Sequence, residues 1–158
     1  MKNFVILTST VEHLSSNLGG KLKNFEFIFP EKNKDGQRCF PDGEVYMKLP
    51  RMGDMKKGRV VVLHSGTPDT NTGLMELELI LQILKDHQIR PELFFTYFPY
   101  GRQDKAFESG ETNVAENLVK KSFEFLLVRE PKESILGSFD LSLIAAYFPE
   151  YETEIKKQ

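Results

Sequence analysis

The run Val60-Val61-Val62-Leu63 constrains the fold more than any other stretch of this chain. Continuous apolar runs rich in β-branched residues are typical of strands buried on both faces of a parallel sheet. A polar loop at 64–71 follows, and leucines at helical spacing then continue to about His87. The order of strand, polar loop and helix predicts one unit of an α/β fold, because parallel strands need crossover connections.

The same alternation recurs along the chain. Apolar runs predict further strands at 4–8, 25–29, 93–98 and 123–128, and an alternating run predicts a half-exposed strand at 45–49. Apolar periodicity predicts additional helices at 11–22, 114–121 and 141–147. We therefore expect an α/β domain with a doubly wound, mostly parallel sheet flanked by helices.

Composition places the chain among ordinary globular proteins. Its 158 residues, 40% hydrophobic and 28% charged, are enough for one domain with its own core. A net charge of −2 argues against a general nucleic-acid binder, although a local cluster can still hold phosphate. The single Cys39 excludes an intramolecular disulfide and fits a reducing compartment. Since no long apolar segment or leader opens the chain, we expect a cytoplasmic protein without a membrane partner.

A polar segment follows the expected strand at 93–98. After Pro99 come Arg102, Gln103 and Asp104, and ligands of open parallel sheets collect at the carboxyl ends of the strands. Arg102 offers a rigid fork of donors suited to phosphate oxygens, and Gln103 can donate and accept. Asp104 suits a ribose hydroxyl, the orientation of Arg102, or Mg²⁺ held through water. The alternative is a solvated surface loop.

Other polar groups have a simpler structural explanation. In Phe40-Pro41-Asp42-Gly43-Glu44, two carboxylates flank a glycine, and Asp42-Gly43 is an ordinary hairpin-turn dipeptide. Glu76 and Glu78 lie within the expected helix, where we predict a solvated face rather than ligands. His13 is expected on the surface. No glycine-rich phosphate cradle and no zinc-ligand spacing are present in the sequence.

Four successive motifs resemble those of ribose-phosphate pyrophosphokinase (PRPP synthetase), and their residues are closest to the archaeal-type branch of that family. They are Phe40–Glu44, Thr70-Asn71 with Leu74-Met75-Glu76-Leu77, Pro99–Lys105, and Gly110-Glu111. The resemblance covers roughly residues 1–150, matches the family's N-terminal domain, and leaves 151–158 as a charged tail. It implies a fold of the type I phosphoribosyltransferase kind.

The resemblance also implies an activity and a site. The family moves the β,γ-diphosphoryl group of ATP to the 1-hydroxyl of ribose 5-phosphate with Mg²⁺, and ATP lies at a subunit interface. By this resemblance, Phe40 stacks on adenine while Asp42 and Glu44 read its amino edge, all from a neighbouring subunit. The other contacts to ATP or ADP would come from Arg102, Gln103 and Asp104 of the second subunit at that interface.

Two departures from the family pattern limit what this chain can do. The family's second domain, with the loop that cradles ribose 5-phosphate and the loop that stabilises the transferring phosphoryl group, has no counterpart in these 158 residues. We therefore expect the isolated chain to be inactive and ribose 5-phosphate to bind only through a partner. Where the family has its Mg²⁺-binding histidine, this chain has Pro131. Mg²⁺ binding is accordingly doubtful, with Glu130 and Glu133 as weak substitutes.

Three functions fit these observations. The leading one is the ATP-recognition half of a split enzyme, in a homo-oligomer or with a phosphoribosyltransferase-like partner chain. The second is a non-catalytic nucleotide-binding or regulatory subunit of a full-length PRPP synthetase. The third is an interaction module that no longer binds nucleotide.

Overall fold

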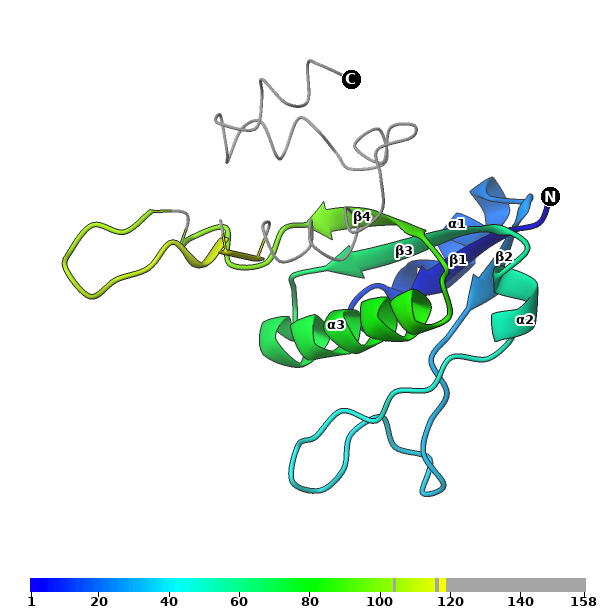
Figure 1. Ribbon diagram of the computed structural model, residues 1–158, viewed down its shortest axis with the longest axis horizontal. Helices are drawn as coiled ribbons and strands as arrows, with labels where there is room; N and C mark the ends of the chain where they lie inside the picture. The colour runs from blue at the N-terminus through cyan, green and yellow to red at the C-terminus, as the bar shows by residue number, and fades with distance from the viewer. Residues whose placement is uncertain (104, 116, 119–158) are drawn as a thin grey trace, which may run out of the picture.

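Four parallel strands form the sheet in the order β2-β1-β3-β4 (Figure 1). The computed structural model describes residues 1–103, 105–115, 117 and 118. The strands are β1 (Asn3–Leu7), β2 (Phe25–Ile28), β3 (Arg59–Ser65) and β4 (Pro91–Tyr97). The four predicted parallel strands in this part of the chain are thus confirmed. The strand expected at 123–128 and the helix expected at 141–147 lie outside the described residues.

Helices cover both faces of the sheet. They are the short 3-10 helix η1 (Glu12–Leu14), α1 (Ser15–Lys21), the unpredicted α2 (Met52–Met55) and α3 (Thr70–Asp86). Side chains of β1 alternate between the faces: Phe4 and Ile6 pack in the cluster with α3, whereas Val5 and Leu7 pack with Leu14 and Leu18 of η1 and α1. The doubly wound arrangement is therefore confirmed. Residues 114, 115, 117 and 118 are helical, where a further helix was expected.

The larger part of the core lies between α3 and the sheet. Leu77, Ile80 and Leu84 of α3 are buried with Val60 and Val62 of β3. Each such side chain contributes about 1.5–3 kcal/mol when it leaves water, so this face supplies most of the apolar stabilisation of the described part. Among the described residues, no helix has the length and apolarity needed to cross a membrane.

Between β2 and α2 the chain makes an excursion that projects from the sheet beyond α3 (Figure 1). The excursion contains a hairpin whose tip is formed by residues 40–44: Phe40 N donates to Glu44 O and Tyr46 N to Arg38 O, each at 2.8 Å. The strand predicted at 45–49 is wrong, because only one isolated antiparallel bridge forms, between Cys39 and Val45. The alternating pattern reflects packing rather than pairing in a sheet: Leu49 is buried and Met47 packs partly against the core.

Candidate functional site

The strand order places a topological switch point between β1 and β3. The connection through α1 leads from β1 to β2 on one side, and the later strands add on the other side. In open α/β sheets the ligand crevice lies outside the carboxyl ends of the strands near such a point. The segments that leave β3 and β4 at this edge are where a site is expected.

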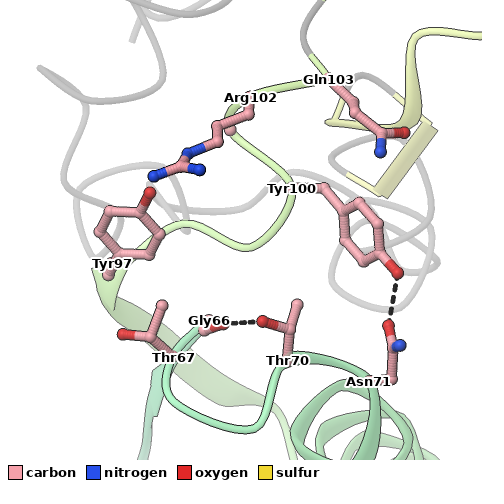
Figure 2. A pocket seen from close by; sticks show the side chains of 9 residues that line it. Gly66, Thr67, Thr70, Asn71, Tyr97, Tyr100, Arg102 and Gln103 are labelled. Atoms are coloured by element: carbon pink, nitrogen blue, oxygen red, sulfur yellow. Dashed lines mark hydrogen bonds between the residues drawn. The ribbon is translucent and has the colours of Figure 1, made fainter.

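A cavity of about 400 Å³ lies at this edge, between the β3–α3 loop with the first turn of α3 and the segment that follows β4 (Figure 2). Its lining residues are Gly66, Thr67, Thr70, Asn71, Tyr97, Tyr100, Gly101, Arg102 and Gln103. The cavity joins residues about thirty positions apart in sequence, which only the parallel pairing of β3 and β4 brings together.

Close backbone contact holds together the two sides of the cavity, which are the β3–α3 loop and the segment after β4. Gly66 N donates to Tyr97 O at 2.8 Å, and a Cβ atom on Gly66 would lie 2.5 Å from Pro99 Cα. Only glycine allows this approach. On the α3 side, Thr70 Oγ1 donates to Gly66 O at 2.6 Å. The Tyr100 hydroxyl donates to Asn71 Oδ1 across the cavity (Figure 2).

The cavity offers donors and positive charge. The seventeen-residue α3 starts at Thr70, has no acidic residue in its first turn, and is not capped by a side chain. Its first backbone N–H groups therefore remain open and carry partial positive charge. Arg102 is exposed, and its guanidinium lies on the same rim as the Tyr97 ring (Figure 2). A guanidinium beside a helix N-terminus favours an anion such as phosphate.

The predicted residues of the hairpin lie elsewhere. Phe40 is 41% exposed, with its ring edge-on to Tyr46 at 6.0 Å between centroids. Asp42 Oδ1 accepts a hydrogen bond from Glu44 N at 3.1 Å, and Gly43 has a φ of +92°. The hairpin turn expected from Asp42-Gly43 is confirmed. None of these residues lines the cavity that holds Arg102 and Gln103.

The remaining predicted site residues lie outside the described residues. They are Asp104, Glu130, Pro131 and Glu133. Within the described part of the chain, no group of three or more His, Cys, Asp or Glu side chains is arranged to hold a metal ion. The donors that line the cavity are suited to an anion.

Glu76 is not on a solvated face, and that prediction is wrong. The residue is 3% exposed, and its carboxylate accepts hydrogen bonds from Ser9 N at 3.0 Å and Ser9 Oγ at 2.5 Å. Arg38 Nη1 lies 3.4 Å from Glu76 Oε1. The signal was present in the sequence, because Glu76 falls on the same helical stripe as the buried residues Gly73 and Ile80. His13 is exposed as predicted.

His64 is a buried group that the sequence did not single out. Its ring is fully buried, Nδ1 lies 2.9 Å from Thr8 Oγ1, and Nε2 has no hydrogen-bond partner. Burial lowers the pKa of His64 from 6.5 to about 4. The imidazole is therefore neutral at physiological pH. It packs edge-on against Phe95 and closes the core directly beneath the carboxyl edge of the sheet.

The fold is of the type I phosphoribosyltransferase-like α/β kind. A crystal structure of phosphoribosylpyrophosphate synthetase from Mycobacterium smegmatis superimposes with a TM-score of 0.63 at 20% sequence identity, covering 97% of this chain and 54% of that one. The family described as the N-terminal domain of ribose phosphate pyrophosphokinase matches residues 32–125, which is more than half of the chain. This chain belongs to that family, as the motifs predicted.

Curated relatives agree with this assignment. The chain is 30% identical over 128 residues to a ribose-phosphate pyrophosphokinase of Sulfurisphaera tokodaii, covering 77% of this chain and 43% of the relative. It is 36% identical over 101 residues to that of Sulfolobus acidocaldarius, covering 60% of this chain and 33% of the relative. The chain thus spans less than half the length of these relatives, in agreement with a match to their N-terminal domain.

Proposed function

We propose that this domain is the ATP-recognition part of a ribose-phosphate pyrophosphokinase, which transfers the β,γ-diphosphoryl group of ATP to the 1-hydroxyl of ribose 5-phosphate. One observation carries the proposal: Arg102 and Gln103 meet the N-terminus of α3 around a single cavity of about 400 Å³. Family membership supplies the reaction. The cavity supplies donors for phosphate oxygens, and its volume is within the range of small-molecule sites.

Within this site the proposed roles follow from the side chains. Arg102 neutralises phosphate charge, and the open N–H groups of α3 bind phosphate oxygens. Thr67 and Gln103 add a hydroxyl and an amide at the rim (Figure 2). Asp104 is proposed to contact the nucleotide as well. Because positioned charge carries phosphoryl transfer, a site with only these groups binds nucleotide but does not complete the reaction.

ATP binding can be tested by calorimetry. We expect Arg102→Ala to weaken ATP binding by about tenfold or more, the usual effect of losing a charge-assisted contact. Arg90→Ala is the matched control, because Arg90 is also exposed but precedes β4 at the amino edge of the sheet. Absence of ATP and ADP binding at millimolar concentration in the unmodified protein would overturn the proposal.

We further propose that a second copy of the chain supplies the adenine contacts. Phe40, Asp42 and Glu44 are exposed on the hairpin and line no part of the cavity, so one nucleotide would have to contact both regions across an interface. The proposal predicts a homo-oligomer in which each complete site combines two copies.

Complementation between two inactive variants tests this arrangement. Phe40→Ala and Arg102→Ala would each impair every site in a pure oligomer. Random co-assembly at equal amounts would restore about one quarter of the sites, because half of the hairpins and half of the cavities are intact. If the mixture binds no more ATP than the separate variants, the two regions do not form one site across copies.

The ribose 5-phosphate site and the catalytic loops are proposed to come from a partner. The isolated chain should therefore make no PRPP, and a phosphoribosyltransferase-like partner chain should restore its formation from ATP and ribose 5-phosphate. Any Mg²⁺ would be held with the nucleotide, with Glu130 and Glu133 as the chain's own candidates. If ATP binds but no candidate partner gives PRPP, the split-enzyme proposal fails.

A regulatory role is the second candidate, and Pro131 favours it. Proline replaces the histidine that binds Mg²⁺ in the family, so nucleotide would be sensed rather than consumed. A full-length PRPP synthetase should then respond to this chain, and the response should require Arg102. If Arg102→Ala and Asp104→Ala change no property except stability, the chain is an interaction module instead.

A further inference from the structure

We infer that Ser9, Arg38 and Glu76 form an anchor that sets the orientation of the hairpin carrying Phe40. The inference deepens the proposed function and rests on it, since the hairpin is there assigned to adenine recognition. The three anchor residues are positioning residues: none lines the cavity, and they act through the hairpin.

The anchor joins three separate segments of the chain. Ser9 follows β1 at the switch point, Glu76 lies in the second turn of α3, and Arg38 stands at the base of the hairpin. Ser9 binds both carboxylate oxygens of Glu76, through its backbone N at 3.0 Å and its Oγ at 2.5 Å. Arg38 Nη1 reaches Glu76 Oε1 at 3.4 Å, and Arg38 Nη2 reaches Glu12 Oε2 at 2.8 Å.

The anchor contacts are largely shielded from water. The side chain of Glu76 is 4% exposed and that of Arg38 is 20% exposed, so little water is available to replace either partner. A carboxylate in such a place needs its hydrogen bonds. Since Ser9 fixes both oxygens of Glu76 against the sheet, the carboxylate gives the guanidinium of Arg38 a fixed point of attachment.

The base of the hairpin is the part that can control its direction. Residues 40–44 are all exposed, so the tip has little support from the rest of the chain. Arg38 lies two residues before Phe40, and its carbonyl closes the hairpin by accepting a hydrogen bond from Tyr46 N at 2.8 Å. With two separate carboxylates held by one planar guanidinium, rotation of the hairpin about its base would break an ion pair.

The first measurement is amide hydrogen exchange of the full chain without nucleotide. Arg38→Gln and Glu76→Gln should each speed exchange of the Phe40 and Tyr46 amides by about tenfold or more, because local opening becomes easier. The β1 and β3 amides should keep their rates. The matched control is Arg59→Gln, which removes an ion pair with Glu92 that lies far from the hairpin.

The second measurement is ATP affinity in the assembled protein. Arg38→Gln should weaken ATP binding about tenfold, as expected when a contact surface must first be ordered. Arg38→Lys should recover part of the affinity, since an ammonium can replace one of the two ion pairs but not both. In the Arg38→Gln/Glu76→Gln double variant, the loss of ATP affinity should equal that of Arg38→Gln alone, because the first change has already broken the Arg38–Glu76 ion pair.

The outcomes are distinguishable from failure of the proposed function. If the unmodified protein binds no ATP, the proposed function fails, and hydrogen exchange still decides whether the anchor orders the hairpin. Unchanged exchange of Phe40 and Tyr46 would overturn the inference. So would equal acceleration across β1, β3 and the hairpin, which indicates a purely structural role. If the glutamine variants do not fold, Arg38→Lys and Ser9→Ala provide the same comparison.

Discussion

Acidification should destabilise this domain mainly through His64 in the range just below neutral pH. The imidazole is fully buried, and a proton on both ring nitrogens would leave Nε2–H without an acceptor. Thr8 Oγ1 at 2.9 Å from Nδ1 is a neutral partner and supplies no negative charge. Burial therefore lowers the pKa of His64 from 6.5 to about 4.

The sign and size of the effect follow from proton linkage. Between pH 6.5 and pH 4 the unfolded chain binds a proton at His64 that the folded chain excludes, so stability falls as the pH is lowered. With a folded pKa of about 4, the free energy of unfolding drops by about 2 kcal/mol from pH 7 to pH 5. The full loss approaches about 3 kcal/mol below pH 4.

Urea denaturation followed by circular dichroism measures this loss at each pH. His64→Gln replaces the ring by a neutral amide and should lower stability at pH 7, but it should remove most of the decline between pH 7 and pH 5. His13→Gln is the matched control, since His13 is exposed and its removal should leave the decline unchanged. An NMR titration should show the His64 ring signals constant down to about pH 5.

One result would refute this reasoning. If His64→Gln and the unmodified protein lose the same free energy of unfolding between pH 7 and pH 5, the buried imidazole is not the group that binds the proton. A His64 ring signal that titrates near pH 6.5 in the folded protein would lead to the same conclusion.

Two further predictions concern the backbone. Gly66→Ala should cost about 1–3 kcal/mol of stability, because its Cβ would meet Pro99 backbone atoms, whereas Gly20→Ala in open space should be neutral or stabilising in the same thermal melts. Gln88→Gly should stabilise by about 1 kcal/mol, since Gln88 has a φ of 59° just after α3 and glycine removes that strain. As a control, Lys85→Gly within α3 should destabilise the domain by about 1 kcal/mol. A lower melting temperature for Gln88→Gly than for the unmodified protein would contradict the argument.

Local pattern was sufficient where burial and periodicity coincide. The strand at Val60–Leu63 was predictable because its β-branched run is largely buried, and the strand at 93–98 because its aromatic run has one buried face, with Leu93 and Phe95 in the core. The strand prediction at 45–49 was wrong for a related reason. This segment leads back from the hairpin and packs Met47 and Leu49 against the core, so its apolar and polar residues alternate as they do in a strand. Period-two alternation indicates an extended chain with one buried face, but it does not indicate whether that chain pairs with another strand.

The site was predictable only in part, for reasons of distance along the chain. Arg102 and Gln103 could be chosen because they follow a predicted strand, but their approach to Asn71 depends on the Gly66–Pro99 contact, which no local pattern reveals. The solvated face predicted for Glu76 was wrong because Ser9 supplies hydrogen bonds that let a carboxylate lie on the buried stripe of α3. The roles of Asp104 and of the segment near Pro131 remain predictions.

If two copies build one nucleotide site, ATP binding and assembly must depend on each other. A ligand that binds only the assembled form stabilises it by RT ln(1 + [L]/Kd), which is about 2.7 kcal/mol at a hundredfold excess over Kd. Saturating ATP should therefore lower the dissociation constant of the oligomer about a hundredfold per complete site. Sedimentation with and without ATP measures this shift, and dilution should weaken ATP binding. Phe40→Ala should abolish the shift, because Phe40 is exposed at the tip and makes no contribution to the cavity of its own copy. An isolated monomer that binds ATP as tightly as the oligomer would show that the hairpin and the cavity work independently.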